Sequence, residues 1–189
     1  MDNSVDQPDW SQIPPPVDDG AVRHLQGASL APVPLQATNG GSIDLLACRC
    51  RTVVYIYPRT GKPSVPNPDG WDAIPGARGC SPQSCAFRDH FNELKQLGVD
   101  QLYGLSTQDT AYQQEAADRL HLPFPLLSDE QLEFAGALGL PTFEADGMTL
   151  LKRCTLIVDD SRVTHVFYPV FPPDRNASDV IAWLSASPG

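Results

Sequence analysis

One run of residues constrains the fold more than any other, namely Thr52 to Tyr57, which reads Thr-Val-Val-Tyr-Ile-Tyr. Every residue in this run is β-branched or aromatic, as is typical of a β-strand. The run has no alternating polar positions, which predicts a central strand that is buried on both faces. Pro58 ends this strand.

The segments around this strand alternate between helix and strand patterns. A hairpin is expected at residues 35–45, because Asn39-Gly40-Gly41 supplies the positive φ angles of a tight turn. Helices are predicted at 81–97, 109–120, 129–138 and 177–184, and further strands at 102–106, 150–158 and 163–168, with 124–127 leading into Ser128. Strand–helix–strand units need right-handed crossovers and a partly parallel sheet. The expected fold is therefore α/β, a thioredoxin-like three-layer sandwich with a central mixed β-sheet, an N-terminal β-hairpin and flanking helices.

The chain of 189 residues is long enough for one domain with a hydrophobic core. Residues 1–31 are polar and proline-bearing, and are expected to form an irregular N-terminal arm, with a short helical turn around 21–26. Residues 32–189 are expected to form the domain, with a Pro/Gly-rich insertion at 59–79. Long irregular loops inside a domain are often functional.

Charge and composition exclude several classes of partner. The formal net charge is −10, and a field of that sign repels phosphate backbones and anionic lipids. No apolar run has the length of a membrane span. The start Met1-Asp2-Asn3-Ser4 lacks the basic and apolar regions of a signal peptide. We therefore expect a cytoplasmic protein that binds neither nucleic acid nor membrane.

The five cysteines are an odd number, which argues against a secreted disulfide scaffold. Cys80 stands at the predicted start of a helix, since Ser81 is a good N-cap and Pro82 suits the first helical position. Helix N-termini carry partial positive charge and unpaired N–H groups, and both favour thiolate over thiol. The alternative is that Cys80 is only a small apolar residue at the end of a loop.

Cys85 follows five residues after Cys80. In an intact helix, five residues rise about 7.5 Å and rotate by about 140° net. The two cysteines then lie beyond the Cα separation of about 7 Å that a disulfide allows. A bond between them requires the start of the helix to unwind, so oxidation would act as a structural switch. The alternative for Cys85 is a buried apolar cysteine on the core face.

Four segments carry a resemblance to a known family. The run Gly79 to Asp89 is similar to the Gly-Cys-Thr-x-x-x-Cys-x-Phe-Arg-Asp pattern of the peroxiredoxins, of the peroxiredoxin Q or bacterioferritin comigratory protein (AhpC/TSA-like) type. The segments 53–58, 122–129 and 153–158 resemble three further segments of that family, in the same order. The likeness covers about residues 32–186.

This resemblance implies roles for particular residues. Cys80 would be the peroxidatic cysteine and Cys85 the resolving one, and Arg153 would lie near Cys80, holding its thiolate and polarising the peroxide. The substrates would be hydrogen peroxide and organic hydroperoxides. Thioredoxin or a similar thiol donor would reduce the resulting disulfide, and no metal or organic cofactor is required.

The chain departs from the family pattern at Pro-x-x-x-Thr/Ser-x-x-Cys, where the threonine hydroxyl binds the peroxide. Ala73 and Ala77 stand at the proline and threonine positions. Pro58 lies 22 residues before Cys80 instead of seven, which implies an insertion of 15 residues. Thr60 would supply the hydroxyl if the insertion loops out, or it is an ordinary loop residue; Ser81 is a second candidate. The insertion is a candidate lid, anchored by Trp71 and Ile74.

The remaining cysteines have no predicted chemical role. Cys48 and Cys50 lack further metal ligands nearby, and Cys154 is expected to pack in a core strand. The alternative function is a thioredoxin-fold thiol–disulfide oxidoreductase or redox sensor with weak or no peroxidase activity, although its usual Cys-x-x-Cys is absent. A third is a non-catalytic domain that binds a protein through the insertion. The missing threonine keeps both alternatives open.

Overall fold

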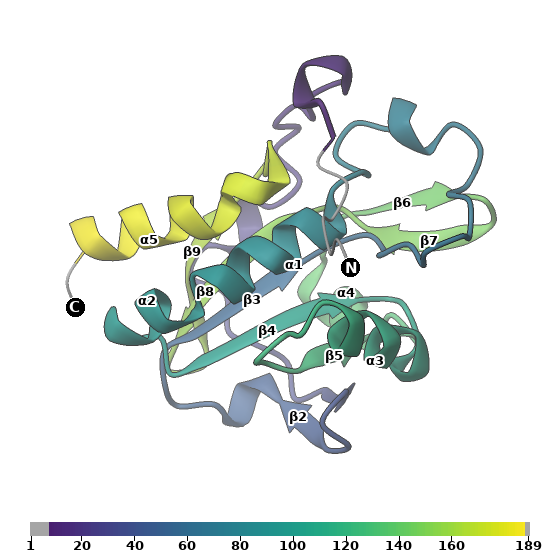
Figure 1. The fold of residues 1–189 in the computed structure, drawn as a ribbon. Helices are drawn as coiled ribbons and strands as arrows, with labels where there is room; N and C mark the ends of the chain where they lie inside the picture. Colours follow the sequence, from purple (N-terminus) through teal and green to yellow (C-terminus); the bar gives the residue numbers. More distant parts are fainter. Residues whose placement is uncertain (1–7, 188–189) are drawn as a thin grey trace.

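The computed structural model describes residues 8–187 and has a seven-stranded sheet at its centre (Figure 1). The strand order is β2-β1-β5-β4-β3-β8-β9. Neighbours among β3, β4 and β5 are parallel, while the outer pairs are antiparallel, so the sheet is mixed as predicted. The strands are β1 Pro34–Ala37, β2 Ser42–Asp44, β3 Thr52–Ile56, β4 Gln101–Ser106, β5 Leu126–Ser128, β8 Cys154–Asp159 and β9 Arg162–Phe167.

Helices cover both faces of the sheet, which confirms the three-layer thioredoxin-like sandwich. The helices are α1 Cys80–Asp89, α2 Phe91–Gln96, α3 Thr110–Arg119, α4 Glu133–Leu138 and α5 Asn176–Ala186. Side chains of α1, α2, α3 and α5 pack against Val53 and Tyr55 on one face of β3. Side chains of α4 and of the N-terminal segment pack against Val54 and Ile56 on the other. Every residue of β3 is buried, as the run of apolar residues predicts.

The prediction of one strand over 150–158 is wrong, because Lys152 and Arg153 interrupt the strand. Residues on either side belong to different sheets: β7 Met148–Leu151 forms a separate hairpin with β6 Thr142–Ala145, whereas β8 joins the central sheet. The Lys152 N–H donates to the carbonyl oxygen of Pro141, and the Arg153 side chain turns into the interior. Apolar residues flank the break on both sides and share the strand pattern, so the two charged residues alone do not reveal it.

Two helix boundaries also differ from the prediction. The expected helix 81–97 begins at Cys80, and a break at His90 divides it into α1 and α2. The expected helix 129–138 begins only at Glu133, because Asp129 is used as a cap. Its carboxylate accepts the backbone N–H groups of Phe134 and Ala135.

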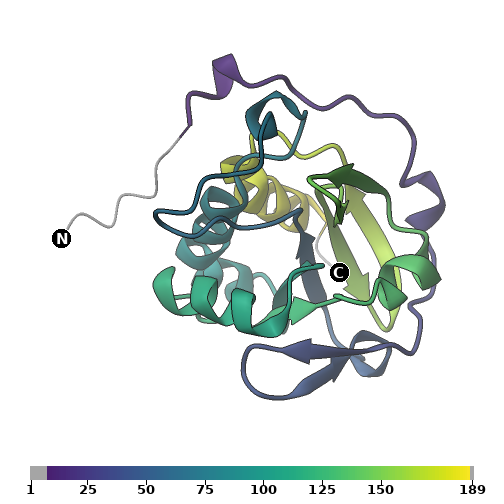
Figure 2. The ribbon, with the colours of Figure 1, turned by 90° about the vertical axis from the view of Figure 1, so that its right-hand side faces the viewer.

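The N-terminal arm lies along the molecule as an ordered strap, drawn in purple in Figure 2. Trp10 donates from its indole Nε1 to Asp174, at 2.9 Å. Asp19 accepts from both Lys152 and Tyr168, and Leu25, in a short 3₁₀ turn, is fully buried. Residues 1–7 of the predicted arm lie outside the described residues. In the part of the chain that the structure describes, no helix has the length and apolar character that crossing a membrane requires.

Gly104 in β4 packs closely against side chains of the two neighbouring strands, β3 and β5. A Cβ atom at this position would lie 2.6 Å from Tyr55 Cζ and 2.6 Å from Leu126 Cδ2. Overpacking of this kind typically costs about 1–3 kcal/mol. We expect Gly104→Ala to lower the free energy of unfolding by that amount, measured by urea denaturation.

Gly136→Ala is the matched control, since nothing lies within 4 Å of an added Cβ in this exposed turn of α4. Alanine favours the helix by up to about 1 kcal/mol over glycine, so this variant should be neutral or more stable. Equal stability of the two variants would contradict the close packing at Gly104.

Candidate active site

Cys80 is the first residue of α1, and Gly79 before it has a φ of +104°. A Cβ on Gly79 would lie 2.6 Å from the Trp10 ring and 2.7 Å from Pro173 Cγ. Both the positive φ and the close neighbours therefore require glycine here. The contact places the helix start, and with it Cys80, between the N-terminal strap and the segment that leads into α5.

The Cys80 sulfur lies 3.2 Å from Arg153 Nη2, and both residues are buried, with exposed fractions of 3% and 4%. The break between β7 and β8 makes this contact possible. Because Cys154 pairs with Ile56, Arg153 is placed just beyond the end of β3, beside the loop that leads to Cys80. A guanidinium in contact with a sulfur atom stabilises negative charge on that sulfur.

Arg153 also holds the loop before Cys80. Its Nη2 lies within 3.2 Å of the carbonyl oxygens of Gly76, Ala77 and Arg78. Three consecutive carbonyl groups therefore converge on the same cation that contacts the sulfur. The guanidinium fixes the position of Cys80 as well as its electrostatic surroundings.

A buried amide network extends from Arg153 to α5, and the sequence analysis missed it. Gln83, with an exposed fraction of 0%, accepts from Arg153 Nη1 and donates to Asn176 Oδ1 at 2.9 Å. The same oxygen accepts from the hydroxyl of Thr155 at 2.6 Å. A glutamine one turn after a cysteine at a helix start is the signal that would have located this network. Asn176 is almost fully buried, so its amide is committed to this network.

Cys85 is buried on α1, and all five cysteines are free thiols in this structure. Burial raises the pKa of the Cys85 thiol, and the nearby charge of Arg88 partly opposes this effect. The helix is continuous from Cys80 to Asp89. Its rise of about 1.5 Å per residue separates the two cysteines along the axis by about 7.5 Å. As predicted, they do not lie within disulfide distance while α1 is intact.

The structure does not bring Thr60 into contact with Cys80. Thr60 is 1% exposed, and its hydroxyl donates to Oε1 of Gln108 at 3.2 Å. Ala77, at the family's threonine position, is buried beside Trp71 and Leu150. Ser81, the second candidate, lines the same hollow as Cys80.

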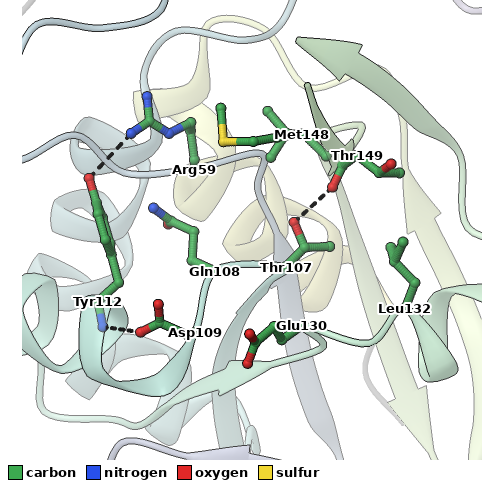
Figure 3. A pocket seen from close by; sticks show the side chains of 10 residues that line it. Arg59, Thr107, Gln108, Asp109, Tyr112, Glu130, Leu132, Met148 and Thr149 are labelled. Carbon is green, nitrogen blue, oxygen red and sulfur yellow. Dashed lines mark hydrogen bonds between the residues drawn. The ribbon is translucent and has the colours of Figure 1, made fainter. Parts of the chain in front are cut away.

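The insertion builds most of the hollow in front of Cys80. This hollow has a volume of about 400 Å³, and Arg59, Lys62 and Trp71 of the insertion line it together with Arg119 of α3. A neighbouring hollow of about 420 Å³ shares Arg59 and reaches β7. Figure 3 shows the Arg59 side chain extending over this second hollow towards Tyr112.

The other candidate residues lie apart from this site. Cys48 and Cys50 are half-buried before the first residue of β3, whereas Cys80 lies beyond its last. Cys154 is fully buried, as predicted, and burial raises its pKa to about 12. His90 contacts Glu93 at the surface. Arg88 donates to the carbonyl oxygen of Leu120, so it caps the end of α3.

Comparison with known protein families gives a match over most of the chain. The family model described as Redoxin matches residues 18–181. Peroxiredoxin Bcp of Escherichia coli is 32% identical over 138 residues, which cover 71% of this chain and 78% of that protein. The chloroplast peroxiredoxin Q of Gentiana triflora is 28% identical over 184 residues, which cover 94% of this chain and 76% of that protein.

Solved structures give the same result. Peroxidoxin BcpB of Mycobacterium tuberculosis superposes with a TM-score of 0.68 at 27% identity, covering 85% of this chain and 96% of that one. The bacterioferritin comigratory protein of Xanthomonas campestris, described for its alkyl peroxide reduction activity, superposes with a TM-score of 0.65. The match covers 82% of this chain and 90% of that one. Because the identity is only 20%, this second likeness supports the fold alone.

The Gln83 network predicts the effect of one substitution. Gln83→Met keeps the length of the side chain but leaves Arg153 Nη1 and Asn176 without their amide partner. An unpaired buried polar group costs about 1–3 kcal/mol. We expect a loss of that size in the free energy of unfolding and slower oxidation of Cys80 by hydrogen peroxide, measured by loss of free thiol.

Gln114→Met is the control, because Gln114 bonds only to Asp118 at the surface of α3. It should change neither stability nor the rate at Cys80. If Gln83→Met also leaves both unchanged, the network does not position Arg153.

The buried Cys154 thiol predicts a pH dependence of stability. Its pKa is raised to about 12 in the folded protein, so the folded state keeps a proton that the unfolded state loses above the ordinary thiol value. Stability is therefore lost as the pH rises. Between about pH 9 and 10.5, the unfolding free energy of the unmodified protein should fall more steeply with pH than that of Cys154→Ala. The difference between the two slopes should be about 1.4 kcal/mol per pH unit. Equal slopes for the two proteins would contradict this.

Proposed function

The chain belongs to the redoxin family and, within it, to the peroxiredoxins of the Q and Bcp type, and on this premise we propose that Cys80 is the sulfur that attacks the peroxide. The protein is a thiol peroxidase. The observation that supports Cys80 is its contact of 3.2 Å with the buried Arg153 guanidinium at the start of a helix. Cys48 and Cys50 have no such cation in contact, and Cys154 has its pKa raised by burial.

The first step is a displacement at oxygen. The Cys80 thiolate attacks the terminal peroxide oxygen, the O–O bond breaks, and the departing oxygen leaves as alcohol or water after it takes up a proton. The sulfur is oxidised to sulfenic acid and the peroxide is reduced by two electrons. Arg153 stabilises the thiolate and donates hydrogen bonds to the polarised peroxide oxygens. The Ser81 hydroxyl lines the same hollow and is a candidate for a further hydrogen bond. Thr60 remains a prediction for this role, which requires its hydroxyl to leave Gln108.

The second step is resolution by Cys85. Its thiolate attacks the sulfenic sulfur, water leaves, and a disulfide joins the two cysteines. Because an intact α1 separates them by about 7.5 Å, the first turns of the helix must unwind. An external dithiol then reduces the disulfide by exchange.

We infer that hydrogen peroxide and organic hydroperoxides are the substrates, and that thioredoxin or a similar dithiol protein is the reductant. The resemblance to peroxiredoxin Q and Bcp supports both. We also propose the cytoplasm as the location. The odd number of cysteines, which argues against a secreted disulfide scaffold, supports a reducing compartment.

The assignment of Cys80 is tested with reduced protein and substoichiometric hydrogen peroxide. We expect rapid loss of two thiols together with a change in tryptophan fluorescence, since Trp10 rests on Gly79 at the start of α1. Cys80→Ser should abolish both signals, whereas Cys48→Ser, at the other end of β3, should leave both intact. Slow oxidation that does not depend on Cys80 would favour a thiol–disulfide oxidoreductase or sensor.

The assignment of Cys85 is tested by trapping the intermediate. In Cys85→Ser, the oxidised Cys80 has no partner, so a sulfenic acid should accumulate and should be seen by mass spectrometry as the gain of one oxygen atom. Cys154→Ser is the comparison, because that thiol is buried in β8 and should not affect resolution. Loss of two thiols in Cys85→Ser at the normal rate would give the resolving role to another cysteine.

A further inference from the structure

The hollow in front of Cys80 has a charge opposite to that of the whole chain. The formal net charge of the protein is −10. Among the described residues that line this hollow, four are cations and none is a carboxylate. The cations are Arg59, Lys62, Arg78 and Arg119. An acidic protein repels anions at long range, so this local reversal of sign needs a reason.

Two of these cations differ from the others in their partners. Arg78 pairs with Asp72, and Arg119 pairs with Glu115. Arg59 and Lys62 form no ion pair with any carboxylate within residues 8–187. No carboxylate of the described residues therefore pairs directly with either cation, and the neighbouring hollow that Asp109 and Glu130 line shares only Arg59 with this one.

Aromatic rings hold Arg59 and Lys62 in place instead. The Arg59 guanidinium lies 5.7 Å from the ring centre of Trp71, and its Nη2 donates to the Tyr112 hydroxyl at 3.3 Å (Figure 3). The Lys62 Nζ lies 4.3 Å from the ring centre of Tyr112. A ring attracts a cation through its quadrupole and leaves the net charge intact. The aromatic side chains therefore fix the positions of both cations and leave their positive charges available to an anion.

We propose that Arg59 and Lys62 form a subsite for the carboxylate of an anionic organic hydroperoxide whose O–O group reaches Cys80. This proposal rests on the peroxidase function and adds a charge class to its substrates. A hollow of about 400 Å³ has the size of a small-molecule site, which favours a small anion over a protein surface. The carboxylate is bound at the two cations, while thiolate attack and O–O cleavage proceed at Cys80 as described above.

The test compares two peroxides that differ only in charge. Cumene hydroperoxide is neutral, and its para-carboxylate derivative is an anion of nearly the same shape. The rate constant for oxidation of Cys80 is measured with each, in a single turnover without reductant. We expect the unmodified protein to react faster with the anion, and this preference to shrink as salt is added.

Removing the cations should remove the preference. Arg59→Gln and Lys62→Gln should each lower the anion-to-neutral rate ratio about threefold, and the double variant about tenfold, as expected for partly exposed charge contacts. Arg59→Lys retains the positive charge and should retain most of the ratio. Loss of the ratio in Arg59→Lys as well would indicate a packing defect in the insertion and overturn the electrostatic reading.

Arg49→Gln is the matched control, because it removes one positive charge from an exposed residue paired with Asp160 near the start of β3. It should leave the ratio unchanged, and an equal drop would overturn the subsite in favour of net charge. A ratio near one in the unmodified protein would also refute the subsite. Failure of both peroxides to oxidise Cys80 would refute the proposed function instead. If the Arg59 and Lys62 variants are slowed only when an acidic dithiol protein reduces their oxidised form, the two cations bind the reductant and not the peroxide. This outcome would refute the proposal.

Discussion

The guanidinium of Arg153 joins parts of the chain that are far apart in sequence. It contacts the sulfur of Cys80, donates to three carbonyl groups of the loop 76–78, and reaches α5 through Gln83 and Asn176. A buried cation is tolerated only when such partners surround it. The reactive sulfur, the loop before it and the helix that follows the last strand therefore depend on one another for their positions.

The segment 59–79 lies around the pair formed by Cys80 and Arg153. Ala77, at the position where the family pattern predicts a hydroxyl residue, packs with Trp71 and Leu150, so this position is part of a small apolar cluster. In exchange, the insertion places Arg59 and Lys62 beside the entrance to Cys80. Under the proposed function, side chains at the entrance act on the approach of a substrate, whereas a hydroxyl at the position of Ala77 would act on the reacting atoms. The two positions would therefore affect different stages of the reaction.

Sequence patterns predicted the elements whose character is local. The strand β3 and the helix expected at 109–120 follow directly from residue types, and the Cys80–Arg153 pair was named from motif resemblance. The break at Lys152 was not predictable, because the residues on each side are apolar and only the separate hairpin divides them. Gln83 was missed for a related reason: a polar residue on a helix is normally exposed, and only its distant partners Arg153 and Asn176 explain its burial.

Gly79 links the N-terminal strap to the start of α1, because the Trp10 ring fills the space that a side chain on Gly79 would occupy. If the first turn of α1 unwinds to join Cys80 and Cys85, as proposed, the backbone beneath the indole moves and this contact is lost. The outer surface of the molecule then differs between its two oxidation states. Another protein touching the strap would recognise an oxidised molecule by shape alone, without access to sulfur.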